Sequence, residues 1–162
     1  MRCAGRPVLG LCGGLQMLGE SLSDPFGIDG DATGLGLLPL ATRFEREKRL
    51  RTVEARFETL DGPWAALSQT ALRGYEIRHG RTQVTAPLAV ALRNAGGEPI
   101  GWQRGNVLGL YAHGVFECDE VLRALFGRQA RTLDAVFDGL ADFAEAHFAP
   151  GSLMRLLQPS RD

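Results

Sequence analysis

Cysteine, net charge and long apolar runs are all scarce in this sequence, and each scarcity excludes a class of protein. The chain has three cysteines in 162 residues, at no metal-like spacing, which favours reduced thiols in a cytosolic setting over a disulfide scaffold. The formal net charge is −1, so no strong field attracts nucleic acid or an anionic membrane. No apolar run approaches the roughly 18 residues of a membrane span. We therefore expect a cytoplasmic protein with small-molecule or protein partners, and neither nucleic acid nor a membrane among them.

Motifs for phosphate and calcium binding are also missing. No Gly-x-x-x-x-Gly-Lys-Ser/Thr segment is present, so any ATP chemistry must lie outside this chain. Asp24, Asp29 and Asp31 cluster in a turn-forming segment, but they lack the spaced ligands and closing glutamate of a calcium loop. A solvated turn is the favoured interpretation, and we assign no metal and no cofactor to these residues.

The composition is that of a folded domain. Hydrophobic residues make up 44% of the chain, which is enough for one core, and residues 1–162 are expected to form a single domain. Short apolar strands alternate with helical segments. That alternation predicts an α/β fold with a mostly parallel central sheet flanked by helices, and residues 7–11 as a central strand.

The most informative stretch is residues 7–19, in which an apolar run breaks at Cys12 and resumes with helical spacing. A nucleophile at a sharp strand-to-helix turn requires very small neighbours two residues before and after it, and Gly10 and Gly14 occupy those positions. An isolated cysteine in an apolar strand is more often part of the core, but the glycines favour catalysis. The adjacent helix N-terminus is expected to favour the thiolate.

A histidine follows the other clear strand. Residues 107–112 form a continuous apolar run, typical of a strand buried on both faces, and His113 comes directly after it. Ligands of open α/β sheets gather at the carboxyl ends of strands. We therefore expect Cys12 and His113 to meet at one edge of the sheet, as nucleophile and acid/base of a cysteine hydrolase.

Three further elements are expected from periodicity. Alternation over residues 43–60, with Val53, Ala55 and Phe57 on one face, predicts a half-exposed strand. Residues 88–93 and 100–103 flank a glycine-containing turn and predict a hairpin. Apolar residues recur at helical spacing from 133 to 148, which predicts a helix with a buried stripe and a structural role for His147.

Four segments carry a resemblance to a known family: residues 10–16 (GLCGGLQ), 34–39 (GLGLLP), 74–82 (GYEIRHGRT) and 109–117 (GLYAHGVFE). The first resembles the active-site motif of triad-type, class I glutamine amidotransferases. Together they resemble the cobyric acid synthase branch of that family, which acts in cobalamin biosynthesis. The resemblance implies a flavodoxin-like three-layer fold that hydrolyses glutamine.

The resemblance also implies roles for individual residues. Cys12 attacks the side-chain amide of glutamine, His113 transfers protons, and the backbone N–H of Gly13 stabilises the oxyanion. Gln16 matches a residue placed near the substrate, although a polar residue on an exposed helix face is an equal alternative. The remaining substrate-binding candidates are Tyr75 and Glu76.

Two positions depart from the family pattern. The family commonly has His-x-Glu, whereas Val115 stands two residues after His113, so no carboxylate occupies the place of the third triad member. Glu117 is a candidate to orient the imidazole, with an ordinary exposed glutamate as the alternative. Arg78 stands where the family usually has a histidine.

The resemblance finally implies a partner. Ammonia made here is expected to pass to an N-terminal synthetase domain or subunit, which would hold ATP and Mg²⁺ and amidate corrinoid carboxylates. Because six residues precede Pro7, we expect the C-terminal part of a longer enzyme without its first strand and helix. A second oxyanion donor would be lost with them, giving a poor glutaminase of limited solubility. The alternatives are the amidotransferase domain of cobyrinate diamide synthase, and an impaired fragment or binding domain of the same fold.

Overall fold

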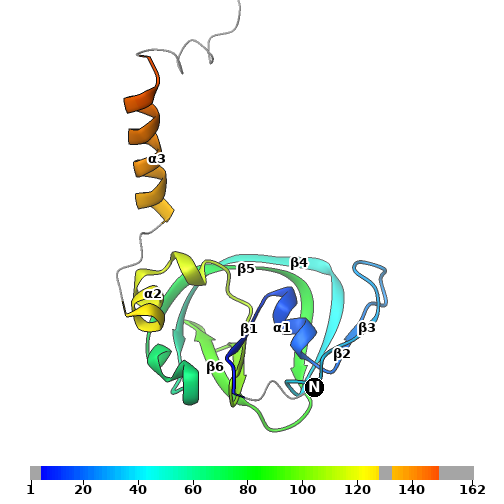
Figure 1. Cartoon of the computed structure of the whole chain (residues 1–162). Coiled ribbons are helices and arrows are strands. Elements are labelled where there is room, and N and C mark those ends of the chain that lie inside the picture. Colours follow the sequence, from blue (N-terminus) through cyan, green and yellow to red (C-terminus); the bar gives the residue numbers. More distant parts are fainter. Residues whose placement is uncertain (1–4, 128–132, 150–162) are drawn as a thin grey trace, which may run out of the picture.

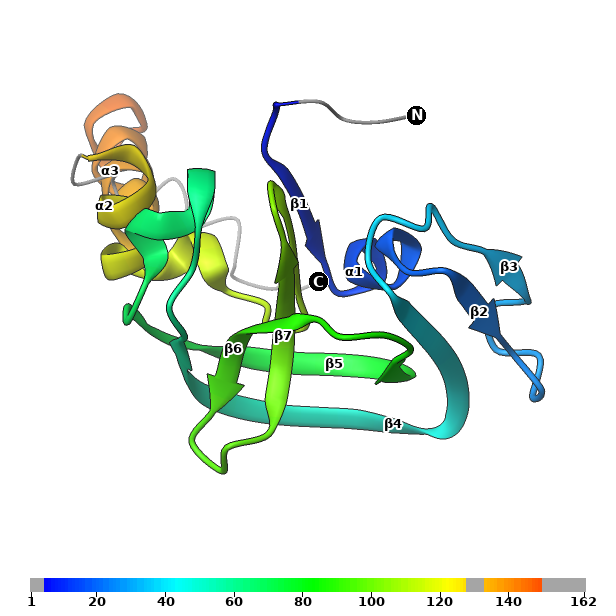
Figure 2. The same cartoon turned by 90° about the horizontal axis from the view of Figure 1, so that it is seen from below.

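The computed structural model describes residues 5–127 and 133–149. They form an eight-stranded sheet in the order β1-β8-β7-β6-β4-β2-β3, with β5 paired to β4 (Figures 1 and 2). The strands are β1 (Val8–Leu11), β2 (Ser21–Ser23), β3 (Ala32–Thr33), β4 (Leu40–Phe57), β5 (Ala71–Val84), β6 (Ala89–Asn94), β7 (Pro99–Arg104) and β8 (Val107–Leu110). The helices are α1 (Gly13–Leu18), α2 (Asp119–Phe126) and α3 (Leu133–His147), with short 3-10 helices η1 (Gly62–Leu67) and η2 (Val115–Glu117).

The sheet is mixed, whereas the sequence pattern predicted mostly parallel strands. β1 runs parallel to β8, and β2 runs parallel to β4. The other described pairings are antiparallel. The reason is the length of the connections: the predicted hairpin forms as β6 and β7, joined through residues 95–98, and so short a turn reverses the chain, while a parallel pairing needs a crossover.

β8 confirms its prediction as a strand buried on both faces, and all four of its residues are buried. β1 lies beside it in register, Leu11 opposite Leu110. Within the described part of the chain β8 is the one pairing partner of β1, so β1 ends the strand order and is not the central strand that we expected. Its place depends on which distant strands pair, which its own sequence does not encode.

The long strands β4 and β5 form a curled antiparallel ribbon, and α1 lies inside its curve (Figure 1). Val53, Ala55 and Phe57 are buried while their neighbours in β4 are exposed, as the alternation predicted. The register shifts between Phe44 and Arg49, and such irregularities bend a strand. The curl brings the middle of β5 toward the ends of β1 and β8, where the site residues lie.

α3 forms over the predicted residues, but its apolar stripe is exposed. Val136, Phe137, Leu140 and Phe143 are between 49% and 59% exposed, and the helix stands away from the sheet (Figure 1). The predicted burial is therefore wrong, because helical periodicity tells which face is apolar and not whether anything covers it. His147 is exposed on the same helix. None of the described helices is long and apolar enough to cross a membrane.

The loop between β2 and β3 also differs from its prediction. The Asp24 carboxylate is buried and accepts backbone N–H groups of Phe26, Asp29 and Gly30 at 3.2, 2.7 and 2.7 Å. It closes an aspartate turn of the kind that this side chain makes with its own backbone. The segment is thus a turn, as expected, but its central carboxylate is not solvated.

Candidate active site

Cys12 lies at a sharp turn between β1 and α1. Its backbone has φ 50° and ψ −108°, a region that residues with a side chain enter only when the surrounding structure holds them there. Its N–H donates to the carbonyl of Leu110 at 2.8 Å, so the end of β8 fixes the turn. The predicted strand–turn–helix elbow is therefore present, with the cysteine at the strained position.

Of the two glycines flanking this turn, Gly10 is the one that the packing requires. A methyl group on Gly10 would lie 2.4 Å from Cδ1 of Leu18 and 2.7 Å from the carbonyl of Gly14. A methyl group on Gly14 or Gly13 meets nothing within 4 Å outside its own helix and its chain neighbours. The close approach of Gly14 is thus made possible by the missing side chain of Gly10.

The Cys12 thiol is partly buried and donates to the carbonyl of Ile77 on β5 at 3.3 Å. Burial raises the pKa of this thiol above its ordinary value, as does the charge of Glu76, although the backbone N–H of Gly13 and the charge of Arg78 lower it. The N–H of Gly13, at the start of α1, favours the thiolate as expected, but desolvation outweighs it and the pKa is raised. The sulfur needs a base to become a nucleophile.

His113, three residues beyond the end of β8, pairs with Tyr75 of β5. The His113 N–H donates to the Tyr75 carbonyl at 2.8 Å, and the Tyr75 N–H donates back at 3.4 Å. The two rings stack with centroids 5.0 Å apart and planes within 5°. A methyl group on Gly74 would lie 2.0 Å from the His113 carbonyl, so this approach requires glycine at position 74.

The imidazole of His113 has no carboxylate partner in the described structure. Its Nε2 atom is buried and makes no hydrogen bond within residues 5–127 and 133–149. Glu117, the sequence-based candidate to orient it, is exposed on η2, and neither a hydrogen bond nor an ion pair of the described residues joins the two side chains. Nε2 thus has no competing hydrogen-bond partner among the residues that the structure describes.

Cys12 and His113 both bind the same stretch of β5. The carbonyl of Tyr75 binds the backbone of His113, and the carbonyl of Ile77 accepts from the Cys12 thiol. Residues two apart on a strand are separated by about 7 Å and direct their carbonyls to the same edge. We call this stretch the β5 edge: the backbone of Tyr75 and Ile77 with the Cys12 and His113 side chains.

Gln16 is buried, which excludes the exposed helix face that the sequence left open as one alternative. It lies in α1, one turn after Cys12, and is 6% exposed. Its Nε2 donates to the Tyr111 hydroxyl at 3.5 Å, and a methyl group on Gly80 would lie 2.2 Å from that Nε2 atom. The side chain therefore belongs to the interior beside the elbow and not to an exposed helix face.

Glu76 lies on the other face of β5 from Tyr75. It is fully buried, and its carboxylate accepts from Nε of Arg51 and, at 3.0 Å, from Nε of Arg78. The Arg78 guanidinium also lies 3.9 Å from the centroid of the Tyr111 ring. The sequence analysis missed this arginine–glutamate cluster, whose five members are Arg49, Arg51, Glu76, Arg78 and Glu98.

The sequence did carry one signal for the cluster. Glu76 and Arg78 share the parity of Leu72, which faces the core in the same strand. A charged pair at the core-facing positions of a strand must find partners, because an unpaired buried charge is strongly destabilising. The arrangement does not bring Glu76 to the β5 edge, where Tyr75 lies.

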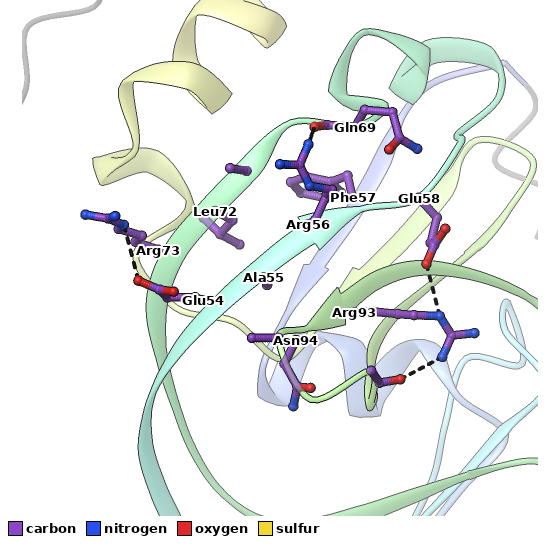
Figure 3. A pocket seen from close by; sticks show the side chains of 13 residues that line it. Glu54, Ala55, Arg56, Phe57, Glu58, Gln69, Leu72, Arg73, Arg93 and Asn94 are labelled. Carbon is purple, nitrogen blue, oxygen red and sulfur yellow. Dashed lines mark hydrogen bonds and ion pairs between the residues drawn. The ribbon is translucent and has the colours of Figure 1, made fainter.

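A separate hollow of about 430 Å³ lies where β4, β5 and β6 meet (Figure 3). Its floor includes Ala55, Phe57 and Leu72. Its charged groups bind one another or the backbone, through the pairs Arg73–Glu54, Arg93–Glu58, Arg93–Gly97 and Arg56–Gln69. Neither Cys12 nor His113 lines it. We assign it no role, and among the described residues no three His, Cys, Asp or Glu side chains gather to hold a metal ion.

Known proteins include relatives that match nearly the whole chain. The chain is 59% identical over 170 aligned residues to a cobyric acid synthase of Methylibium petroleiphilum, covering 98% of this chain and 34% of that protein. It is 58% identical over 158 residues to a cobyric acid synthase of a Polaromonas species, covering 94% of this chain and 31% of that protein. The chain thus spans about a third of the length of these relatives.

The fold has a solved counterpart. The structure of PurLQS from Thermotoga maritima superimposes with a TM-score of 0.56 at 19% identity, over 76% of this chain and 62% of that one. This likeness shows a shared fold, and the fold is α/β, as the sequence predicted. The family of CobB/CobQ-like glutamine amidotransferase domains matches residues 1–121. With three quarters of its length matched, the chain belongs to the CobB/CobQ-like glutamine amidotransferase domain family.

Proposed function

We propose that this chain hydrolyses glutamine with Cys12 as nucleophile and His113 as acid and base. The observation that carries the proposal is their convergence on the β5 edge, with Cys12 at a strained elbow and Nε2 of His113 buried without a partner in the described residues. Strain and unsatisfied polar groups that the rest of a fold must support cluster at functional sites.

The proposed chemistry is acyl transfer. The Cys12 proton passes to Nε2 of His113 as the sulfur attacks the side-chain carbonyl carbon of glutamine, which gives a tetrahedral oxyanion. The backbone N–H of Gly13 donates to that oxyanion. The imidazolium then returns the proton to the leaving nitrogen, ammonia departs, and a glutamyl thioester remains. Water activated by His113 hydrolyses the thioester and restores the thiol.

The other three predicted site residues take different positions in this proposal. Gln16, buried beside the elbow, supports the wall of the glutamine pocket. Tyr75, which is 39% exposed, contacts His113 and borders the same opening. Glu76 acts at a distance, because it holds Arg78 in place. The positive charge of Arg78 lowers the pKa of Cys12 by more than the charge of Glu76 itself raises it.

The relatives extend the proposal to a partner. Since two relatives at 58–59% identity are cobyric acid synthases about three times as long as this chain, we propose that the ammonia is delivered to an ATP-dependent synthetase domain or subunit. That partner would hold ATP and Mg²⁺ and amidate a corrinoid carboxylate. A panel of corrinoid acids with the reconstituted synthetase tests this step separately from glutamine hydrolysis.

The test of the hydrolase is ammonia release from glutamine, by the chain alone and with the synthetase region of a relative. His113→Asn should lower kcat by about 10²–10⁴-fold, the usual contribution of a general acid–base residue. His147→Asn is the matched control, since His147 is exposed on α3, and should leave the rate unchanged. An equal rate for wild type and His113→Asn would refute the proposed mechanism.

A further inference from the structure

The geometry points to Tyr75 as the residue that positions the imidazole of His113, in the place that a carboxylate takes in a triad. This inference rests on the proposed function and deepens it. It answers the question that the sequence left open, namely what orients His113 when Val115 stands where the family commonly has glutamate. An unrestrained imidazole loses productive geometry, and a catalytic group that is misplaced by about 1 Å can cost 10²-fold in rate.

The backbone of Tyr75 holds the main chain of His113 in place. Two hydrogen bonds join His113 to Tyr75, at 2.8 and 3.4 Å, and the missing side chain of Gly74 lets the two segments approach. Gly114 follows with φ 79°, a conformation that glycine adopts without strain, and turns the chain away. The main chain of His113 is therefore fixed on the β5 edge before its side chain is considered.

The ring of Tyr75 holds the imidazole of His113 in place. The parallel rings, 5.0 Å apart at the centroids and 5° between planes, have the offset-stacked arrangement that aromatic pairs favour. Rotation of the imidazole about its side-chain torsions would break this contact. The stack leaves the ring nitrogens at its rim, and Nε2 is buried without a partner among the residues that the structure describes.

The Tyr75 ring also stabilises the positive charge of a protonated His113. When His113 takes the Cys12 proton, it becomes a cation lying over the face of an aromatic ring, an arrangement that the ring quadrupole stabilises. A carboxylate partner would stabilise the same cation by direct attraction. Tyr75 therefore supplies both functions of a third triad member, orientation and stabilisation of the imidazolium, through its ring and not through its hydroxyl group.

Substitutions at position 75 separate the ring from the hydroxyl. In glutamine hydrolysis, Tyr75→Phe should keep kcat within about 2-fold, because the stack is retained. Tyr75→Leu and the strand-compatible Tyr75→Thr should lower kcat by about 10-fold, with KM changed by less than about 3-fold. Phe116→Leu is the matched control: Phe116 is also an exposed aromatic, three residues after His113 but outside the stack, and its loss should leave both constants unchanged.

A second readout does not depend on activity. In the stack, the tyrosine ring current shifts the proton resonances of the His113 imidazole, and NMR should detect this shift in wild type and Tyr75→Phe but not in Tyr75→Leu or Tyr75→Thr. The chain has three histidines, so His113→Asn assigns the signal. His147 is an internal control, because its own stack on Phe143, with ring centroids 4.0 Å apart, should persist in every variant.

The outcomes are distinguishable. A raised KM with an unchanged kcat in Tyr75→Leu would make Tyr75 a substrate-binding residue and overturn the inference. Loss of activity in Tyr75→Phe would do the same by transferring the role to the hydroxyl. If wild type releases no ammonia from glutamine, the proposed function fails, whereas the NMR shift still decides whether Tyr75 orients His113.

Discussion

Polar groups are paired on the interior face of β5, whereas the β5 edge holds a strained and an unpaired group. On the interior face, the arginine–glutamate cluster gives both oxygens of Glu76 a guanidinium partner and stacks Arg78 on Tyr111. At the β5 edge, Cys12 holds a positive φ and Nε2 of His113 has no partner in the described chain. Neighbouring residues of one strand thus differ: those on the interior face pair their charges, and those at the edge lie beside strained or unsatisfied groups.

The charged cluster and the contact of Cys12 with Ile77 lie on the same strand, β5. Buried ion pairs add little net stability over apolar packing, but losing one partner leaves a charge uncompensated. The cluster joins Arg51 of β4 to Glu76 directly opposite on β5, one residue before the Ile77 carbonyl that accepts from Cys12.

Substitution of Cys12 is expected to have the largest effect. Cys12→Ala and Cys12→Gly should both lower glutamine hydrolysis by at least about 10⁴-fold, because the nucleophile is gone. Glycine should also relieve the positive φ of this position, so the free energy of unfolding of Cys12→Gly should exceed that of Cys12→Ala by about 1 kcal/mol. Urea denaturation of both variants measures the difference, and equal stabilities would mean that the elbow stores no strain.

On the interior face, the largest effect is expected from Glu76→Gln. This change replaces the carboxylate that accepts from the buried Arg78 by a neutral amide and should lower the free energy of unfolding by about 3 kcal/mol. Glu54→Gln is the control on the neighbouring strand. The Glu54 pair with Arg73 is 3.6 Å long and exposed, so its loss should change the same quantity by less than about 0.5 kcal/mol. Similar values for both variants would contradict the assignment of the cluster as a stabilising core.

The glycines of the elbow give a smaller, paired effect. Gly10→Ala should lower the free energy of unfolding by about 2 kcal/mol, since the added methyl group overlaps Leu18 and the carbonyl of Gly14. Gly14→Ala meets no such atoms and should leave stability equal or slightly raised, because alanine favours the helix. Thermal melts of both variants check the pair, and a reversed order would show that the elbow packs differently.

The smallest effect is a pH dependence at Glu98. Partial burial acts to raise its pKa, but hydrogen bonds from Arg49 and Arg51 outweigh it and lower the pKa from 4.5 to about 2. Because the folded pKa is depressed, the stabilisation is complete above the unfolded value of 4.5 and is lost as the pH falls through about 2.

Glu98→Gln tests this dependence. The Glu98 side chain is 40% exposed, so solvent screening limits the loss at pH 7 to about 1 kcal/mol. The difference in unfolding free energy between wild type and Glu98→Gln should narrow on acidification below pH 4.5. A difference that stays constant down to pH 2 would contradict the depressed pKa.

Local patterns predicted the parts of the site that depend on neighbours in sequence. The glycine-flanked Cys12 and the apolar run before His113 each encode their own conformation, and the β6–β7 hairpin follows from its turn. Pairing between distant strands is not encoded in this way. One partner of Glu76, Arg51, lies 25 residues earlier, and this pair can be recognised only once the register of β4 on β5 is known.

Desolvation and coverage were the other limits. The sequence placed Cys12 at a helix N-terminus but could not show that burial raises the pKa of its thiol. Periodicity identified the apolar face of α3 but not its exposure. The pKa of a thiol and the exposure of a helix face both depend on residues that come near only in the folded chain. The spacing of residues in the sequence predicts the backbone conformation alone.

Affinity labelling with a diazoketone analogue of glutamine, followed by peptide mass spectrometry, tests most directly whether the β5 edge is a glutamine-hydrolysing site. The probe reacts covalently only where it binds beside an activated nucleophile. We expect one adduct per chain, on Cys12, blocked by excess glutamine and slowed in His113→Asn. An adduct on Cys118 or Cys3 in its place, or none on Cys12 at saturating probe, would contradict it.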